Sequence, residues 1–217
     1  MSEIFKPVRV AVNVMRARLT VIGFNIAIVS FQLPQLYGQS GGIELPGMDH
    51  AVHVTANAAL LMALALSFCA LVTFIISGSL DEVGFCTHWS LVAGDLLMYL
   101  GLAHTVAGFF APLGISINIF ATNLSRSASE ISILHAALSV TGGAAWFLAI
   151  YVGPAVSLVR SPFDRRINII LGIAYLLLVL VLAWVTLQAV RIEEMGLDHP
   201  PNWIVGMLRE LVQPLRW

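Results

Sequence analysis

Long stretches without charged residues alternate with short polar segments along this chain. Four such stretches cover residues 53–78, 89–112, 131–159 and 167–190, and Asp95 is the only Asp, Glu, Lys or Arg in them. A helix needs roughly 20 residues to cross a hydrocarbon core of about 30 Å, so each stretch is long enough. The stretches are continuously apolar rather than alternating, which favours transmembrane helices over strands.

A fifth apolar segment, residues 19–36, is shorter and contains Asn25 and Gln32. We predict a fifth spanning helix here, and a re-entrant or interfacial segment is the alternative. The basic region before it is long and no small-x-small cleavage site follows, so the segment lacks the pattern of a signal peptide. The predicted fold class is therefore an all-α integral membrane protein, with residues 1–217 forming one bundle of transmembrane helices joined by short loops.

The C-terminal tail, residues 201–217, mixes apolar residues with polar ones. This pattern is typical of a short amphipathic helix in the membrane interface, with Trp203 and Trp217 as anchors. A disordered tail is the alternative. We predict a C-terminal interfacial helix.

Composition and charge placement agree with a membrane location. Of the 217 residues, 59% are hydrophobic and 11% are charged, whereas ordinary soluble domains contain about 25% charged residues. The net charge of −1 gives no basic signal, so we expect no nucleic-acid partner. Lys and Arg concentrate before the first helix and in the loop 160–166, and such residues stay on the cytoplasmic side. We therefore expect a bacterial inner-membrane protein with a cytoplasmic N-terminus.

Two histidines, His104 and His135, lie within predicted membrane helices at similar expected depths. His104 shares a helix side with Gly94, Gly101 and Gly108, which repeat every seven residues. Small residues let a neighbouring helix, or a flat porphyrin, come close. Imidazoles ligate haem iron, so we predict a b-type haem between His104 and His135. The alternative is that each histidine bonds to its helix neighbours while the glycines pack helix against helix.

Two further polar groups carry candidate chemistry. Asp49, His50 and His53 come together at the expected outer end of the second helix, and His and Asp are ligands for Cu or Zn. Helix capping is the alternative for this group. Asp95 is the one carboxylate within a predicted membrane helix, a placement typical of proton or cation pathways, although a structural carboxylate is equally compatible.

These features leave several functions open. The sharpest hypothesis is a haem-binding electron-transfer subunit of a membrane complex. The alternatives are a proton or cation channel or transporter subunit, a structural subunit, and an outer-surface Cu/Zn site. In each case we expect the lipid bilayer and other membrane subunits, or further copies of the chain, as partners. No residue pattern assigns the chain to a family or identifies it as an enzyme.

Overall fold

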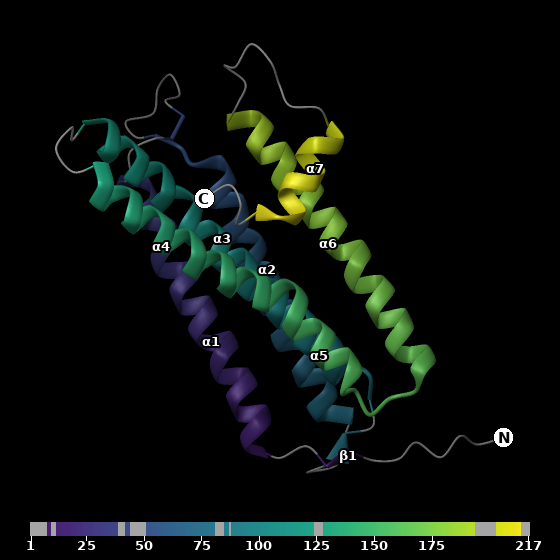
Figure 1. The fold of residues 1–217 in the computed structure, drawn as a ribbon. Helices are drawn as coiled ribbons and strands as arrows, with labels where there is room; N and C mark the ends of the chain where they lie inside the picture. The colour runs from purple at the N-terminus through teal and green to yellow at the C-terminus, as the bar shows by residue number, and fades with distance from the viewer. Residues whose placement is uncertain are drawn as a thin grey trace.

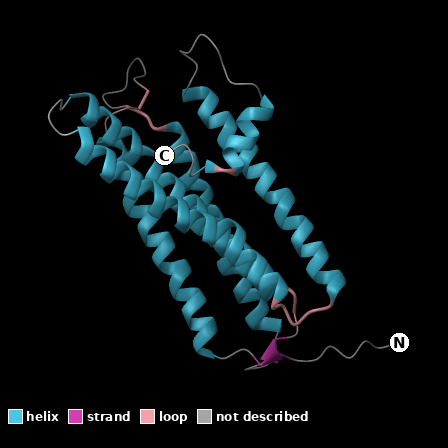
Figure 2. Ribbon diagram, in the orientation of Figure 1, coloured by secondary structure: helices cyan, strands magenta, loops and turns pink. Residues whose placement is uncertain are grey.

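The computed structural model describes residues 8–9, 12–38, 42–43, 51–80, 85–86, 88–123, 128–193 and 203–213. Within this part of the chain, five helical segments are long and apolar enough to span a membrane. They run side by side in an elongated bundle (Figures 1 and 2). The helices that contain these five segments are α1 Val12–Gln35, α2 Val54–Leu80, α3 Ser90–Asn123, the consecutive α4 Ala128–Phe147, η2 Leu148–Val152 and α5 Gly153–Val159, and α6 Arg165–Glu193.

The remaining elements are short. A 3-10 turn, η1 Leu36–Gly38, continues α1, and α7 Trp203–Leu211 follows α6. The two-residue strands β1 Val8–Arg9 and β2 Phe85–Cys86 pair antiparallel. We call the end of the bundle where α2 begins the His53 end, and the opposite end, where α6 begins, the Arg165 end; these are the upper and lower ends in Figure 1.

Helices α2 and α3 form the centre of the bundle. The glycines of α3 face α2, because an added Cβ would come within 3.0 Å of Ser67 at Gly101 and within 2.7 Å of Leu60 at Gly108. At Gly94 the same addition would meet the Phe74 ring at 2.9 Å. The seven-residue glycine repeat therefore allows close packing of two helices. Helix α2 fills the space beside these glycines.

Helix α1 packs against α2 as one continuous element, so segment 19–36 is helical throughout except for its last residue, which begins η1. Its polar residues face inward: Asn25 is buried and its Nδ2 donates to Ser67 Oγ at 2.8 Å. Gln32 is also buried. These placements explain why an apolar helix carries two amides, since polar side chains bond across helices in the membrane.

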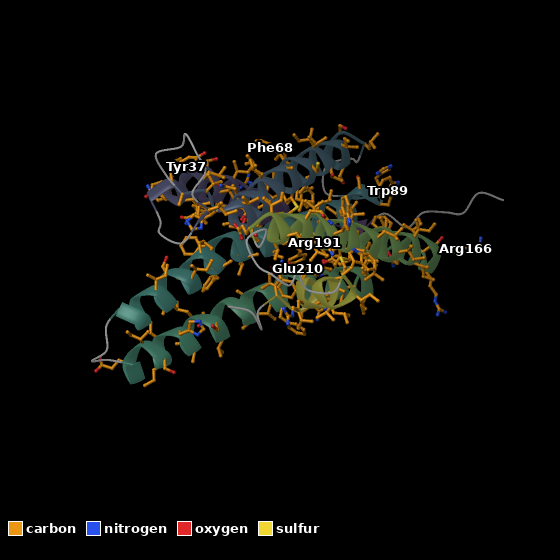
Figure 3. All side chains as sticks on the ribbon, turned by 90° about the horizontal axis from the view of Figure 1, so that it is seen from above. Tyr37, Phe68, Trp89, Arg166, Arg191 and Glu210 are labelled. Atoms are coloured by element: carbon orange, nitrogen blue, oxygen red, sulfur yellow. The ribbon has the colours of Figure 1, made fainter. Side chains whose placement is uncertain are left out.

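The prediction that the third helix ends at Pro112 is wrong, because α3 continues to Asn123. Its 34 residues correspond to a length of ~51 Å. Proline removes one backbone hydrogen bond, and a membrane helix tolerates this loss when neighbours satisfy the freed group. The far part of α3 and the first part of α4 project together away from the other helices (Figure 3).

A five-residue π-helix, η2, interrupts the fourth span immediately before Gly153-Pro154. The backbone N–H of Gly153 donates a hydrogen bond to the carbonyl of Leu148, five residues earlier, which is the pattern of a π-helix. Pro154 has no N–H to donate to the carbonyl four residues earlier, that of Ile150. The hydroxyl of Tyr175 in α6 donates to this carbonyl instead. The proline in the fourth span thus leaves a backbone carbonyl to which α6 binds.

Residues 203–211 form a helix as predicted, and α7 packs against α6. A Cβ added at Gly206 would lie 2.6 Å from Leu187 of α6. At the end of α7, the Tyr151 hydroxyl donates to the Leu211 carbonyl at 2.6 Å. These contacts join α7 to both α6 and η2. Helix α7 is therefore part of the bundle, and its other side is apolar. Trp217 lies outside the described residues.

Candidate functional site

A cavity with a mixed polar and apolar lining lies at the His53 end of the bundle, between α2, α3, α6 and α7. Its volume is about 160 Å³. That is room for several water molecules, since one water needs about 10–15 Å³ of such volume. The polar lining residues are His53, Thr55, Thr186, Glu193, Glu210 and Gln213, and the apolar ones are Ala56, Ala59, Ala107, Ala111, Pro112, Ile115 and Val190.

Glu193 has a fixed position in this lining. It is the last residue of α6, and its carboxylate accepts hydrogen bonds from the Thr55 backbone N–H at 2.8 Å and the Thr55 hydroxyl at 2.6 Å. The first N–H groups of a helix lack helical partners, and its positive end favours an anion. Glu193 therefore caps α2 and places a carboxylate at the edge of the cavity.

Glu210 is the most deeply placed carboxylate of the cavity, with an exposed fraction of 3%. Its Oε2 accepts a hydrogen bond from Gln213 Nε2 at 2.8 Å. The side of α7 away from Glu210 exposes Ile204 and Leu208. This helix thus presents its carboxylate to the interior and its apolar residues outward, which is the reverse of a helix on the surface of a soluble protein.

His53 immediately precedes α2, is buried, and lines the same cavity. Asp49 and His50, the other members of the predicted copper or zinc site, lie outside the described residues. Among the described residues, no group of three or more His, Cys, Asp or Glu is placed to hold a metal ion. The Cu/Zn site therefore remains a prediction.

His104 lines a second, smaller cavity that adjoins the first. This cavity has a volume of about 20 Å³ and shares Thr186, Glu210 and Gln213 with the larger one. The Nδ1 atom of His104 lies 2.9 Å from the Leu100 carbonyl oxygen. A carbonyl only accepts hydrogen bonds, so Nδ1 carries the hydrogen and Nε2 of the neutral ring is free to accept a proton.

The structure does not bring His104 and His135 together. In the α3–α4 pair, Gly142 packs against Phe110 and Gly153 against Tyr99. This register sets the two histidines about 13 residues apart along the pair, or ~20 Å. Both axial ligands of one haem must reach the same iron, so these two residues do not fit that role. His135 Nε2 is buried and has no hydrogen-bond partner among the described residues.

Asp95 forms an ion pair with Arg18 of α1, away from the two cavities. Arg18 Nη2 donates to Asp95 Oδ2 at 2.7 Å, and Arg18 Nε lies 2.6 Å from Oδ1. The guanidinium also lies 5.9 Å from the centroid of the Phe74 ring. This two-point contact supports the structural interpretation of Asp95 that its sequence position left open.

Sequence reasoning missed the partner Arg18 and the two glutamates. Arg18 stood just before the predicted start of the first helix, whereas α1 begins at Val12. Glu193 and Glu210 were placed after the last span and in the tail. The four-residue spacing of Gly206 and Glu210, opposite Leu208, is the signal that one side of a tail helix faces inward.

The chain matches no protein-family model, no curated protein and no solved structure. Its function must therefore be inferred from the geometry of the cavity.

Proposed function

We propose that this chain is a membrane transport protein, or a subunit of one, that binds a cation or a proton in the cavity at the His53 end. The observation that carries this proposal is Glu210, a carboxylate with 3% exposure on a helix whose other side is apolar. Burying an ionisable group is costly, and within membrane proteins such groups mark ion pathways and proton relays.

The chemistry of the lining supports a positively charged ligand. Among the described residues that line this cavity, two carboxylates, two hydroxyls and one amide contribute oxygen atoms, and none is Lys or Arg. Oxygen atoms are the preferred ligands of hard cations, and carboxylates also exchange protons. The lining therefore favours a cation over an anion such as phosphate.

The charges at the Arg165 end support an orientation for this proposal. The beginning of α1, the loop before α6 and the first residues of α6 lie at that end (Figure 1), and they carry Arg16, Arg18, Arg160, Arg165 and Arg166. Cytoplasmic segments are rich in such residues. In a bacterial inner membrane the Arg165 end would then face the cytoplasm, and the cavity would take its ligand from the outer side.

Flux through reconstituted vesicles tests the proposal. Wild-type protein is expected to move protons or alkali cations down an imposed electrical gradient, and Glu210→Gln is expected to reduce the rate by about 100-fold. Glu130→Gln is the matched control, because Glu130 is an exposed carboxylate on α4. Equal rates in wild type and Glu210→Gln, or no flux above that of empty vesicles, would show the proposal to be wrong.

A further inference from the structure

We infer that the ion taken up in the cavity is a proton, and that His104 accepts this proton from Glu210. This inference rests on the proposed function and names the species that the site handles. Two observations carry it independently of each other. One is the change in cavity size between Glu193 and His104, and the other is the hydrogen bond that fixes the His104 ring.

The difference in volume between the two cavities selects a proton over a metal cation. The larger cavity of about 160 Å³ contains His53 and Glu193, whereas the smaller one, of about 20 Å³, contains His104. The smaller volume holds about one water molecule. A metal cation keeps several oxygen ligands around it, and there is no room for that shell beside His104. A proton needs only a hydrogen-bonded chain, so it can pass where a cation cannot.

Glu210 lines both cavities together with Thr186 and Gln213, and it is the titratable residue among these three shared, described residues. The rest of the small cavity is mainly apolar, with Trp146, Ile150, Val179, Leu182, Ala183 and Leu211 around the polar Thr186 and Gln213. Among the described residues of the small cavity, His104 is therefore the next titratable acceptor for a proton that arrives at Glu210 from the larger cavity.

The ring of His104 is oriented for this transfer. Its Nδ1–H donates to the Leu100 carbonyl, so the lone pair is on Nε2. In the step that we infer, the O–H bond of protonated Glu210 breaks and a water molecule passes the proton on. An N–H bond then forms at Nε2. Glu210 becomes a carboxylate and His104 an imidazolium, and the net charge of the pair does not change.

The other ionisable groups around this pair are positioned differently. On the α2 and α6 sides, His53 and Glu193 line the larger cavity, and Arg191 lines neither cavity. On the η2 and α6 sides, the hydroxyls of Tyr151 and Tyr175 are bound to backbone carbonyls. Within the part of the chain that the structure describes, Glu210 is thus the carboxylate that shares a cavity with His104.

The test uses full-length protein in phosphatidylcholine–phosphatidylglycerol vesicles that contain the pH indicator pyranine. A potassium–valinomycin potential drives uptake, and radioactive sodium is measured in parallel. We expect proton uptake without sodium uptake in the wild type, and a loss of about 100-fold in both Glu210→Gln and His104→Gln. His135→Gln is the matched control, because His135 lines neither cavity, and it should keep the wild-type rate.

The possible failures are distinguishable. Sodium uptake, or an unchanged rate of proton uptake in His104→Gln, would overturn the inference. In either case the rate in Glu210→Gln still tests the proposed function. Absence of all flux would overturn the proposed function itself. Nitrogen-15 NMR of histidine-labelled protein gives a second measurement that does not need the His104 variant to fold. It should show His104 protonated at Nδ1 throughout and gaining a proton at Nε2 on acidification, and the opposite tautomer would refute the assignment.

Discussion

The Arg18–Asp95 ion pair predicts an unequal cost for removing its two members. Their side chains are 20% and 8% exposed, respectively, so Asp95 is the more deeply buried partner. Removing one member of a buried pair leaves an uncompensated charge and typically costs about 3–5 kcal/mol. We expect Arg18→Ala to lower the free energy of unfolding by about this full amount, because the Asp95 carboxylate is buried and would lose its charged partner.

Asp95→Ala should cost less. The aliphatic stem of arginine can stay packed while its charged group moves toward water, and Arg18 lies within the first two turns of α1. We expect a loss of about 1–3 kcal/mol, which is the cost of an unsatisfied polar group rather than of a buried charge. Arg16→Ala is the control on the same helix, because Arg16 is exposed, and it should change stability by less than about 0.5 kcal/mol.

The assay is reversible unfolding in mixed dodecyl-maltoside and dodecyl-sulfate micelles, followed by circular dichroism, with each variant compared at the same detergent mole fraction. A double change of Arg18 and Asp95 to Leu should recover much of the loss, because well-packed apolar residues often replace a buried pair at little cost. Equal losses in the two single variants, or a greater loss in Asp95→Ala, would refute the reasoning from burial. Wild-type proton flux in folded Asp95→Asn would separately remove Asp95 from the ion pathway.

Two further substitutions test the attachments of α6 and α7. Tyr175→Phe leaves the Ile150 carbonyl without its donor and should lower stability by about 1–3 kcal/mol in the same detergent titration; an unchanged midpoint would mean that another group satisfies this carbonyl. Gly206→Val places a side chain against Leu187 and should lower the free energy of unfolding by about 1–3 kcal/mol, whereas Gly23→Val, where nothing lies within 4 Å, should be tolerated. Equal effects of the two valines would contradict the close packing of α7.

The helices themselves followed from the sequence. The uncharged stretches around residues 53–78 and 167–190 are close in extent to α2, Val54–Leu80, and α6, Arg165–Glu193. This agreement has a simple cause, because the length and apolarity of a spanning helix are local properties of the chain. The missing hydrogen-bond donor at Pro154 is likewise a local property, since proline has no backbone N–H.

The pairing of polar groups was decided only by the tertiary structure. Asp95 was visible as an intramembrane carboxylate, but Arg18 lies 77 residues away in the sequence, and no periodicity reveals such a partner. His104 and His135 looked close because the third helix was expected to end at Pro112. The continuation of α3 to Asn123 shifts the register of the α3–α4 pair and separates them.

The cavity also depended on an element that the sequence assigned to the membrane interface. The tail residues predicted a helix, but its hydrophobic pattern alone did not say whether the polar side met water or the bundle. Gly206 allows α7 to approach Leu187 closely, and this contact carries Glu210 into the interior. Local patterning therefore determined which segments are helices. Packing between distant segments determined which polar groups meet, because the free-energy cost of burying a charge depends on the groups that surround it.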